Sequence, residues 1–185
     1  AKASGDQARE PGRAAQLRLR TLATIRWVAV TGQAIAVLSV HYGLGLEVPL
    51  MPALSAICAS AALNFATSFG QPAKARLSDR GAAIFLAYDI LQLSALLFLT
   101  GGLTNPFALL MLAPVTVSAT MLPPRVTFAL GALSVMALSL LVQFHLPLPW
   151  GPEGFAFPDR FLFGMWTSLV LGVVFIAAYA GRVAG

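Results

Sequence analysis

The chain contains six apolar segments, five of them long, and these segments constrain its fold more than any other feature. A helix rises 1.5 Å per residue, so about 20 apolar residues cross the roughly 30 Å hydrocarbon core of a bilayer. The fourth segment is short and flanked by proline, which predicts a helix that is less tilted or lies partly in the interface. We therefore expect an all-α membrane protein, a bundle of six transmembrane helices. The expected spans are residues 22–43, 48–69, 82–100, 107–122, 126–145 and 159–181.

The composition argues against a soluble globular domain. Hydrophobic residues make up 58% of the 185 residues and charged residues only 10%, whereas a soluble domain carries about 25% charged residues. No connecting loop is long enough to form a folded domain, so we expect no catalytic residues. The single cysteine, Cys58, rules out an internal disulfide framework and a multi-cysteine metal site. We expect Cys58 to be a small buried hydrophobic residue, and we expect no bound metal.

The basic residues are concentrated on one predicted side of the membrane. The net charge of +5 also fits nucleic-acid binding, but its distribution follows the positive-inside rule, so we expect no nucleic-acid partner. Both termini are then cytoplasmic, and only Arg160 falls on the outer side. The chain divides into a basic N-terminal segment (1–21), a membrane domain (22–181) and the start of an exit segment (182–185). Beyond the N-terminal segment, the inner basic residues are Arg26, Lys74, Arg76, Arg80, Arg125 and Arg182.

The stretch GGLTNPF, residues 101–107, interrupts the apolar sequence between the third and fourth spans. Gly101 and Gly102 are suited to ending the third helix, because glycine accepts the left-handed conformation that closes a helix. Asn105 is a favourable N-cap for the fourth helix, and Pro106 fits its first turn. A well-capped helical hairpin at the membrane surface accounts for these residues, and this structural interpretation stays open.

The same stretch also fits a binding site for a flat ligand. A helix N-terminus presents unpaired N–H donors, which we expect near Phe107 and Ala108, beside an aromatic ring. Glycine lets a planar molecule approach the backbone. A quinone head group has a ring that stacks on Phe107 and two carbonyls that accept hydrogen bonds. A site with donors only favours quinone over quinol by about one hydrogen bond, on the order of 1 kcal/mol.

GGLTNPF matches the GGxxNPF heptapeptide of redox-sensing histidine kinases of the RegB/PrrB type, and LRLRTLATIRWVAVTGQ resembles the first span of that family. Members have six spans ahead of a cytoplasmic kinase, with the heptapeptide between the third and fourth. The resemblance implies the membrane sensor domain of such a kinase, in a bacterial inner membrane. It implies ubiquinone or a related membrane quinone as the sensed ligand, whose oxidised form lowers autophosphorylation. The implied quinone-binding residues are Gly101, Gly102, Leu103, Thr104, Asn105, Pro106 and Phe107.

The resemblance also implies partners for the chain besides membrane lipid. A kinase of this type forms a homodimer and passes its signal through a cytoplasmic kinase domain to a response regulator. The phosphoacceptor histidine and ATP-binding domain of the family lie beyond the part that this chain matches, so we expect no kinase activity from it. Gly164, Ser168 and Gly172 recur every four residues on the sixth span, and small residues allow close helix approach. They predict either packing within the bundle or a dimer interface through this helix.

An acidic residue, Asp89, lies inside the third span, where a carboxylate costs roughly 2.5–3.5 kcal/mol on insertion scales. Gln92 and Thr100 share its helix face, which leads towards Gly101. We interpret the three as a polar track from the quinone site into the bundle, or alternatively as a packing contact. Arg26 is most simply an anchor that extends to the inner interface. It can pair with Asp89 only if the first and third spans are neighbours.

Other functions stay open. A small transporter or channel would use Asp89 and Gln92 on its pathway, and a plain membrane anchor would leave sensing to another part of the protein. His41 and His145, at outer span ends, are suited in type to a haem site, although no further haem motif accompanies them. Trp150 fits an aromatic-belt anchor or a second wall of the quinone site.

Overall fold

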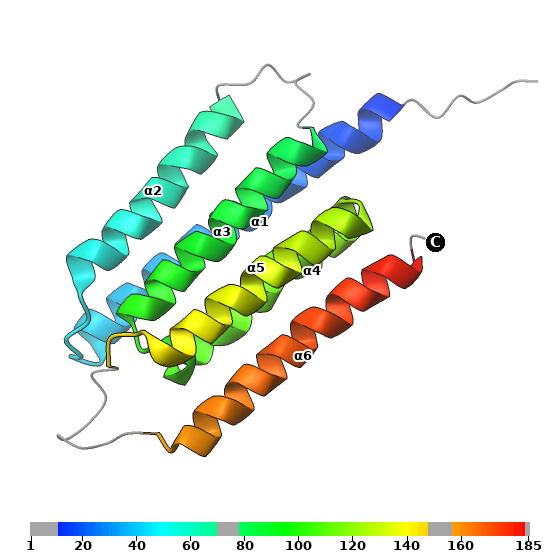
Figure 1. The fold of residues 1–185 in the computed structure, drawn as a ribbon. Helices are drawn as coiled ribbons and strands as arrows, with labels where there is room; N and C mark the ends of the chain where they lie inside the picture. Colours follow the sequence, from blue (N-terminus) through cyan, green and yellow to red (C-terminus); the bar gives the residue numbers. More distant parts are fainter. Residues whose placement is uncertain (1–10, 70–77, 148–156, 184–185) are drawn as a thin grey trace, which may run out of the picture.

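The computed structural model describes residues 11–69, 78–147 and 157–183, and within these ranges the chain forms six α-helices and no strand (Figure 1). The expected six-helix bundle is confirmed, and most boundaries agree with the expected spans to within a few residues. α1 differs, because it begins within the basic N-terminal segment. The helices are α1 (Pro11–Leu38), α2 (Leu50–Phe69), α3 (Asp79–Leu99), α4 (Leu112–Met121), α5 (Pro124–Gln143) and α6 (Asp159–Val183), with a π-helical turn, η1 (Ser39–Gly43), after α1.

The fourth span is built differently from the other five, which are long and apolar enough to cross a membrane. A 3₁₀ segment, η3 (Pro106–Met111), precedes α4. Pro106 begins this segment, and Pro114 cannot donate an α-helical hydrogen bond to the Leu110 carbonyl. Because a 3₁₀-helix rises about 2.0 Å per residue, the two pieces extend about 27 Å, against about 24 Å for a continuous α-helix. The short fourth span thus nearly matches the hydrocarbon thickness.

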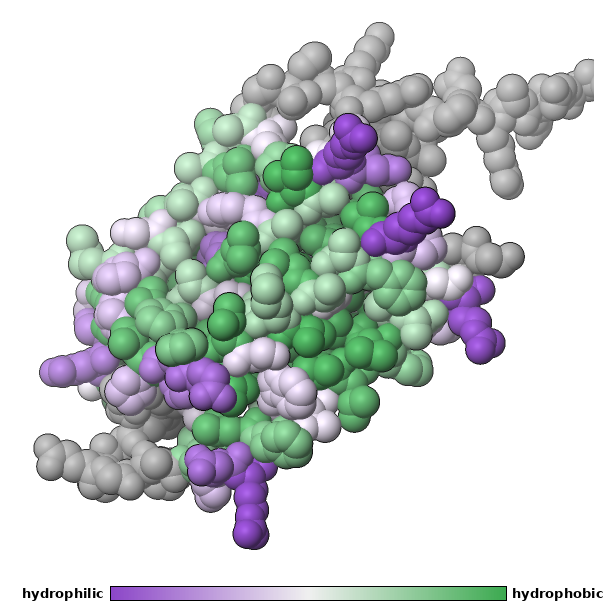
Figure 2. All heavy atoms as spheres, in the orientation of Figure 1, coloured by the Kyte–Doolittle hydropathy of each residue, from purple (hydrophilic) through white to green (hydrophobic). Residues whose placement is uncertain are grey.

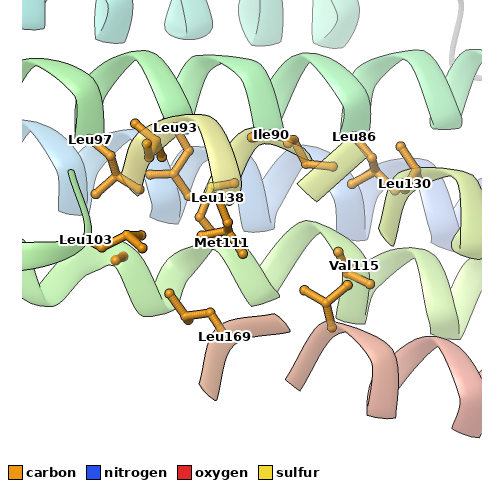
Figure 3. Close-up of a cluster of buried hydrophobic side chains, with 14 of the residues drawn as sticks. Leu86, Ile90, Leu93, Leu97, Leu103, Met111, Val115, Leu130, Leu138 and Leu169 are labelled. Atoms are coloured by element: carbon orange, nitrogen blue, oxygen red, sulfur yellow. The ribbon is translucent and has the colours of Figure 1, made fainter. Parts of the chain in front are cut away.

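The main hydrophobic core lies among α3, α4, α5 and α6 (Figure 3). Leu86, Ile90, Leu93 and Leu97 form its α3 face, because they recur every three or four residues on one side of the helix. α1 packs on α2, and α2 packs on α3, around a smaller cluster that includes Val30. α1 and α3 are not among the closely packed helix pairs of the described chain. Space is therefore left between these two helices.

The outer surface of the bundle is apolar, as a lipid-facing surface must be. Figure 2 shows hydrophobic residues across the middle of the visible face and the most hydrophilic ones towards its two ends. Phe163 and Phe175 of α6 are 66% and 72% exposed. Cys58 of α2 is also exposed, so the expectation that it is buried within the bundle is wrong: it lies on a side of α2 that the other helices leave uncovered.

The start of α1 and the end of α6 lie at the same end of the bundle (Figure 1), as an even number of spans requires. Their cytoplasmic placement stays a prediction from the charge distribution. Lys74, Arg76 and Trp150 lie outside the described residues.

The small residues of α6 differ in whether another helix of the bundle packs against them. A Cβ on Gly172 would lie 3.1 Å from Cδ2 of Leu112, so the glycine lets α6 approach the start of α4. A Cβ on Gly164 would meet nothing within 4 Å, and Ser168 is exposed. Packing within the bundle accounts for Gly172 only. The dimer interface through α6 stays a prediction that rests on Gly164 and Ser168.

The turn after α3 requires glycine for two separate reasons. Gly101 and Gly102 have φ angles of +104° and +57°, which confirms that they end α3 in the left-handed conformation. The ring of His145, just after α5, lies against Gly102: a Cβ there would be 2.7 Å from Cγ of His145. Beside it, the N–H of Leu146 donates to the carbonyl of Phe98 at 2.8 Å. The end of α5 thereby closes over the turn.

We predict that Gly102→Ala lowers the free energy of unfolding by about 2–4 kcal/mol, because the left-handed backbone is strained and the new methyl group displaces His145. Thermal unfolding of the chain in nanodiscs measures this loss. Gly181→Ala is the matched control, since its Cβ would lie at an ordinary 3.5 Å from the Phe128 ring. Equal stability of the two variants would contradict the prediction.

Candidate functional site

A cavity of about 620 Å³ lies between α1, α3 and the segment formed by η3 and α4. Ligand sites for small molecules commonly measure about 300–1,000 Å³. α1 lines the cavity from Ile25 to Val37, η1 adds Val40, and the η3–α4 segment lines it from Pro106 to Val117. Its walls are mostly apolar with a few polar side chains, which is the composition expected of a site for an apolar ligand with polar groups at one end.

The sequence predicted seven quinone-binding residues in the heptapeptide and three polar-track residues. Six of these ten residues line this cavity. The polar track of α3 is among them, so its three members do share a face that borders open space. The four other residues of the heptapeptide do not line it: Gly101, Gly102 and Leu103 are buried in the turn, and the hydroxyl of Thr104 donates to the carbonyl of Gly101 at 2.6 Å. The six lining residues are Asp89, Gln92, Thr100, Asn105, Pro106 and Phe107.

An ion pair bridges α1 and α3 at the wall of the cavity. Nε of Arg26 lies 3.1 Å from Oδ1 of Asp89, and only 7% of the Arg26 side chain is exposed. The guanidinium also lies over the rings of Phe85 and Tyr88, 5.2 Å and 5.7 Å from their centroids, where cation–π attraction adds to the pairing. The interpretation of Arg26 as an interfacial anchor is wrong, because its buried side chain is directed to Asp89.

A second polar bridge joins the same two helices, between Gln33 of α1 and Gln92 of α3. Nε2 of Gln92 donates to Oε1 of Gln33 at 3.0 Å, and Nε2 of Gln33 donates back to Oε1 of Gln92 at 3.4 Å. In a bilayer, unpaired amides are costly, so each glutamine satisfies the other. Both also line the cavity. The two bridges connect α1 and α3 through side chains, while their backbones stay apart.

Asn105 organises the end of the cavity at the heptapeptide. Its Nδ2 donates to the carbonyl and hydroxyl oxygens of Thr100 at 3.0 Å and 2.8 Å. Its Oδ1 accepts from the N–H of Phe107 at 2.9 Å, which confirms the predicted N-cap. The ring of Phe107 is 44% exposed and lines the cavity.

The expectation of unpaired backbone donors at this N-terminus is wrong. The N–H of Phe107 is used by the Asn105 side chain, and the N–H of Ala108 donates to the Asn105 carbonyl at 2.9 Å. Among the described residues that line the cavity, the buried donors without a hydrogen-bond partner belong instead to Arg26, at Nη2 and at Nε, the atom that forms the ion pair with Asp89. The expectation of a site that offers hydrogen-bond donors only is likewise wrong for this cavity, because Asp89, whose carboxylate accepts hydrogen bonds, lines it.

Sequence reasoning gave no functional role to Gln33, considered His145 only for a haem site, and assigned Arg26 to the membrane surface. The contact of Gln33 with Gln92 could have been predicted from the sequence, because Arg26 and Gln33 share one face of the first span, and Asp89 and Gln92 share one face of the third. Two polar faces inside apolar spans tend to meet, because neither is tolerated by lipid. No comparable signal marked His145. Within the described residues, no three His, Cys, Asp or Glu side chains cluster as a metal site would require.

Comparison with known proteins agrees with this architecture. Residues 19–182 match the PilS-like transmembrane domain family, so the chain belongs to that family and is a six-helix membrane domain. No solved structure matches the chain.

Two curated relatives narrow the class further, and both are sensor histidine kinase RegB of Cereibacter sphaeroides. One is 44% identical over 168 residues, which cover 90% of this chain and 36% of the relative. The other, from strain ATCC 17023, is 44% identical over 169 residues, covering 91% and 37%. The chain therefore spans a little over a third of the length of these relatives. The resemblance to RegB-type kinases is confirmed, and the chain is a multi-span domain of the bacterial inner membrane.

We predict that Asp89→Leu destabilises the chain by about 3–5 kcal/mol, because it leaves the buried charge of Arg26 unpaired. The double variant Arg26→Met/Asp89→Leu recovers most of this loss, since two apolar side chains of similar length replace the pair. Thermal unfolding in nanodiscs of the native chain and both variants measures the difference. A double variant no more stable than Asp89→Leu would mean that the two charges do not depend on each other.

Proposed function

We propose that this chain is the quinone-binding sensor domain of a RegB-type histidine kinase, and that it binds ubiquinone or a related membrane quinone in the cavity between α1, α3 and η3–α4. One observation carries the proposal: three heptapeptide residues and three polar residues, two in α3 and one at its C-cap, line the same cavity. A cavity with apolar walls and few polar groups suits a ligand with a polar ring and a long apolar tail.

The rim of the cavity allows a ligand to enter from the bilayer. Val28 of α1 is 69% exposed and Leu110 of η3 is 42% exposed, and both line the cavity. A quinone dissolved in lipid therefore reaches the site without crossing water. Its tail is already in an apolar environment before binding, so the hydrophobic effect adds little to its affinity, and the tail contributes only through the side chains that it contacts in the cavity. We expect weak binding that follows the concentration of quinone in the membrane.

The polar groups of the cavity treat the two redox forms differently. Quinone carbonyls only accept hydrogen bonds, and the guanidinium of Arg26 has donors to spare. Quinol hydroxyls also donate, and the carboxylate of Asp89 that would accept is already held by Arg26. The oxidised form thus uses a free donor, whereas the reduced form competes with an existing ion pair. A difference of about one hydrogen bond gives a several-fold preference for quinone.

The signal of the bound quinone would leave the membrane domain by the route that the name of the relatives, sensor histidine kinase, suggests. We propose that α6 leads to a cytoplasmic kinase domain, that the kinase acts on a response regulator, and that two copies associate through α6. The exposed Gly164 and Ser168 support this last point, because small residues let two helices approach closely in lipid. The membrane domain itself would carry no catalytic residue.

We predict that Phe107→Ala weakens binding of ubiquinone about threefold to tenfold, because the cavity loses aromatic contact with the ligand. Titration of the chain in nanodiscs with ubiquinone, followed by tryptophan quenching and by extraction of bound quinone, measures the change. Phe98→Ala is the matched control: Phe98 is 40% exposed and does not line the cavity. The same titration with ubiquinol tests the preference for the oxidised form.

Non-saturable partitioning that is equal in the native chain and in both variants would overturn the proposal. The chain would then serve as a membrane anchor, with sensing elsewhere in the protein.

A further inference from the structure

The two ends of the cavity differ in what they offer to a ligand. At the heptapeptide end, the polar atoms that line the wall are paired: Asn105 with Thr100, and the N–H of Phe107 with Asn105. At the other end, Nη2 of Arg26 is buried without a hydrogen-bond partner, and 93% of the Arg26 side chain is buried, since 7% is exposed. A buried, unpaired N–H costs free energy that an acceptor on a ligand recovers.

One head group cannot touch both ends. Asp89 lies in α3 eleven residues before Thr100, the C-cap of that helix, which separates them by about 16 Å at 1.5 Å per residue. A single six-membered ring is much shorter than this distance. The Gln33–Gln92 pair occupies the wall between the two ends, and its amides already satisfy each other.

We propose that the head group of the ligand binds at the Arg26–Asp89 end of the cavity, with a ring carbonyl accepting from the guanidinium of Arg26, a residue that lines the cavity. This inference rests on the proposed function, and it assigns the heptapeptide a different contact. Phe107, Pro106 and Leu110 then line the passage of the isoprenoid tail. The binding step forms hydrogen bonds only, and the ligand is neither oxidised nor reduced by the chain.

This position has a structural consequence for α1. The ring would contact the side chains that join α1 to α3, in a region where the two backbones are not closely packed. Phe85 and Tyr88 hold the guanidinium from α3, so Arg26 is pre-oriented and loses little side-chain freedom when a ligand binds. A hydrogen bond from a pre-oriented, buried guanidinium is a strong one.

Two probes that differ only in the tail separate the two ends. The first is 2,3-dimethoxy-5-methyl-1,4-benzoquinone, which is the ubiquinone ring without a tail, and the second is ubiquinone with its full tail. Each is titrated into the 185-residue chain in nanodiscs. The variants are Arg26→Met/Asp89→Leu, which removes both charges together, and Phe107→Ala. Arg125→Met and Phe98→Ala are the controls, since Arg125 is exposed and neither residue lines the cavity.

We expect the double variant to weaken both probes about tenfold or more, because each loses a hydrogen bond to a charged group. We expect Phe107→Ala to weaken tailed ubiquinone several-fold and to leave the tail-less ring within about twofold of the native value, because only the tail reaches Phe107. The opposite pattern, in which Phe107→Ala weakens the ring and the double variant does not, would place the head group at the heptapeptide and overturn the inference.

A measurement on the native chain keeps the test decisive if the double variant does not fold. A photoreactive tail-less quinone is cross-linked to the chain in nanodiscs, and the labelled residues are mapped by mass spectrometry. Labelling around Arg26 and Asp89 supports the inference, and labelling confined to residues 101–107 overturns it. Saturable binding of neither probe to the native chain would instead be a failure of the proposed function.

Discussion

The Arg26–Asp89 ion pair is the interaction on which the arrangement of this bundle depends. Lipid offers no hydrogen bonds, so each charge inside the membrane must find its partner within the protein. Nε of Arg26 reaches Oδ1 of Asp89 across 3.1 Å, and this requirement brings α1 beside α3 although their backbones are not closely packed. The paired amides of Gln33 and Gln92 reinforce the same placement.

The cavity follows from that placement. α3 to α6 share one hydrophobic core, while α1 and α2 form a pair held to it by a smaller cluster and by polar side chains. Long side chains hold α1 at a distance from α3, so the space between them stays open. The turn at residues 101–107 closes one end of this space, where Asn105 and the glycines fix the start of η3. A shared core and a separately held α1 are a suitable combination for the ligand-binding sensor domain that we propose.

The η3–α4 segment connects the cavity to the last helix. On one side it lines the cavity with Phe107 and Pro114. On the other, Leu112 lies against Gly172 of α6, and α6 leads to the end of the chain that a kinase domain follows in the proposed arrangement. The proposed ligand in the cavity and α6 would therefore contact the same short segment. The family match over residues 19–182 contains α2 to α5 completely and most of α1 and α6, so this connection lies within the shared domain.

The apolar segments alone determined the class, the number of helices and most of their boundaries, because a chain in lipid has few alternatives to spanning helices. Local chemistry also determined the turn: glycine accepts positive φ and asparagine caps a helix whatever surrounds them. The tertiary structure decided which residues meet. In it, Arg26 pairs with Asp89, and Cys58 is exposed. The ring of His145 packs against Gly102, and the N–H groups of Phe107 and Ala108 both donate to Asn105. Each of these depends on which helix faces are neighbours, and the pattern along one helix does not specify its neighbours.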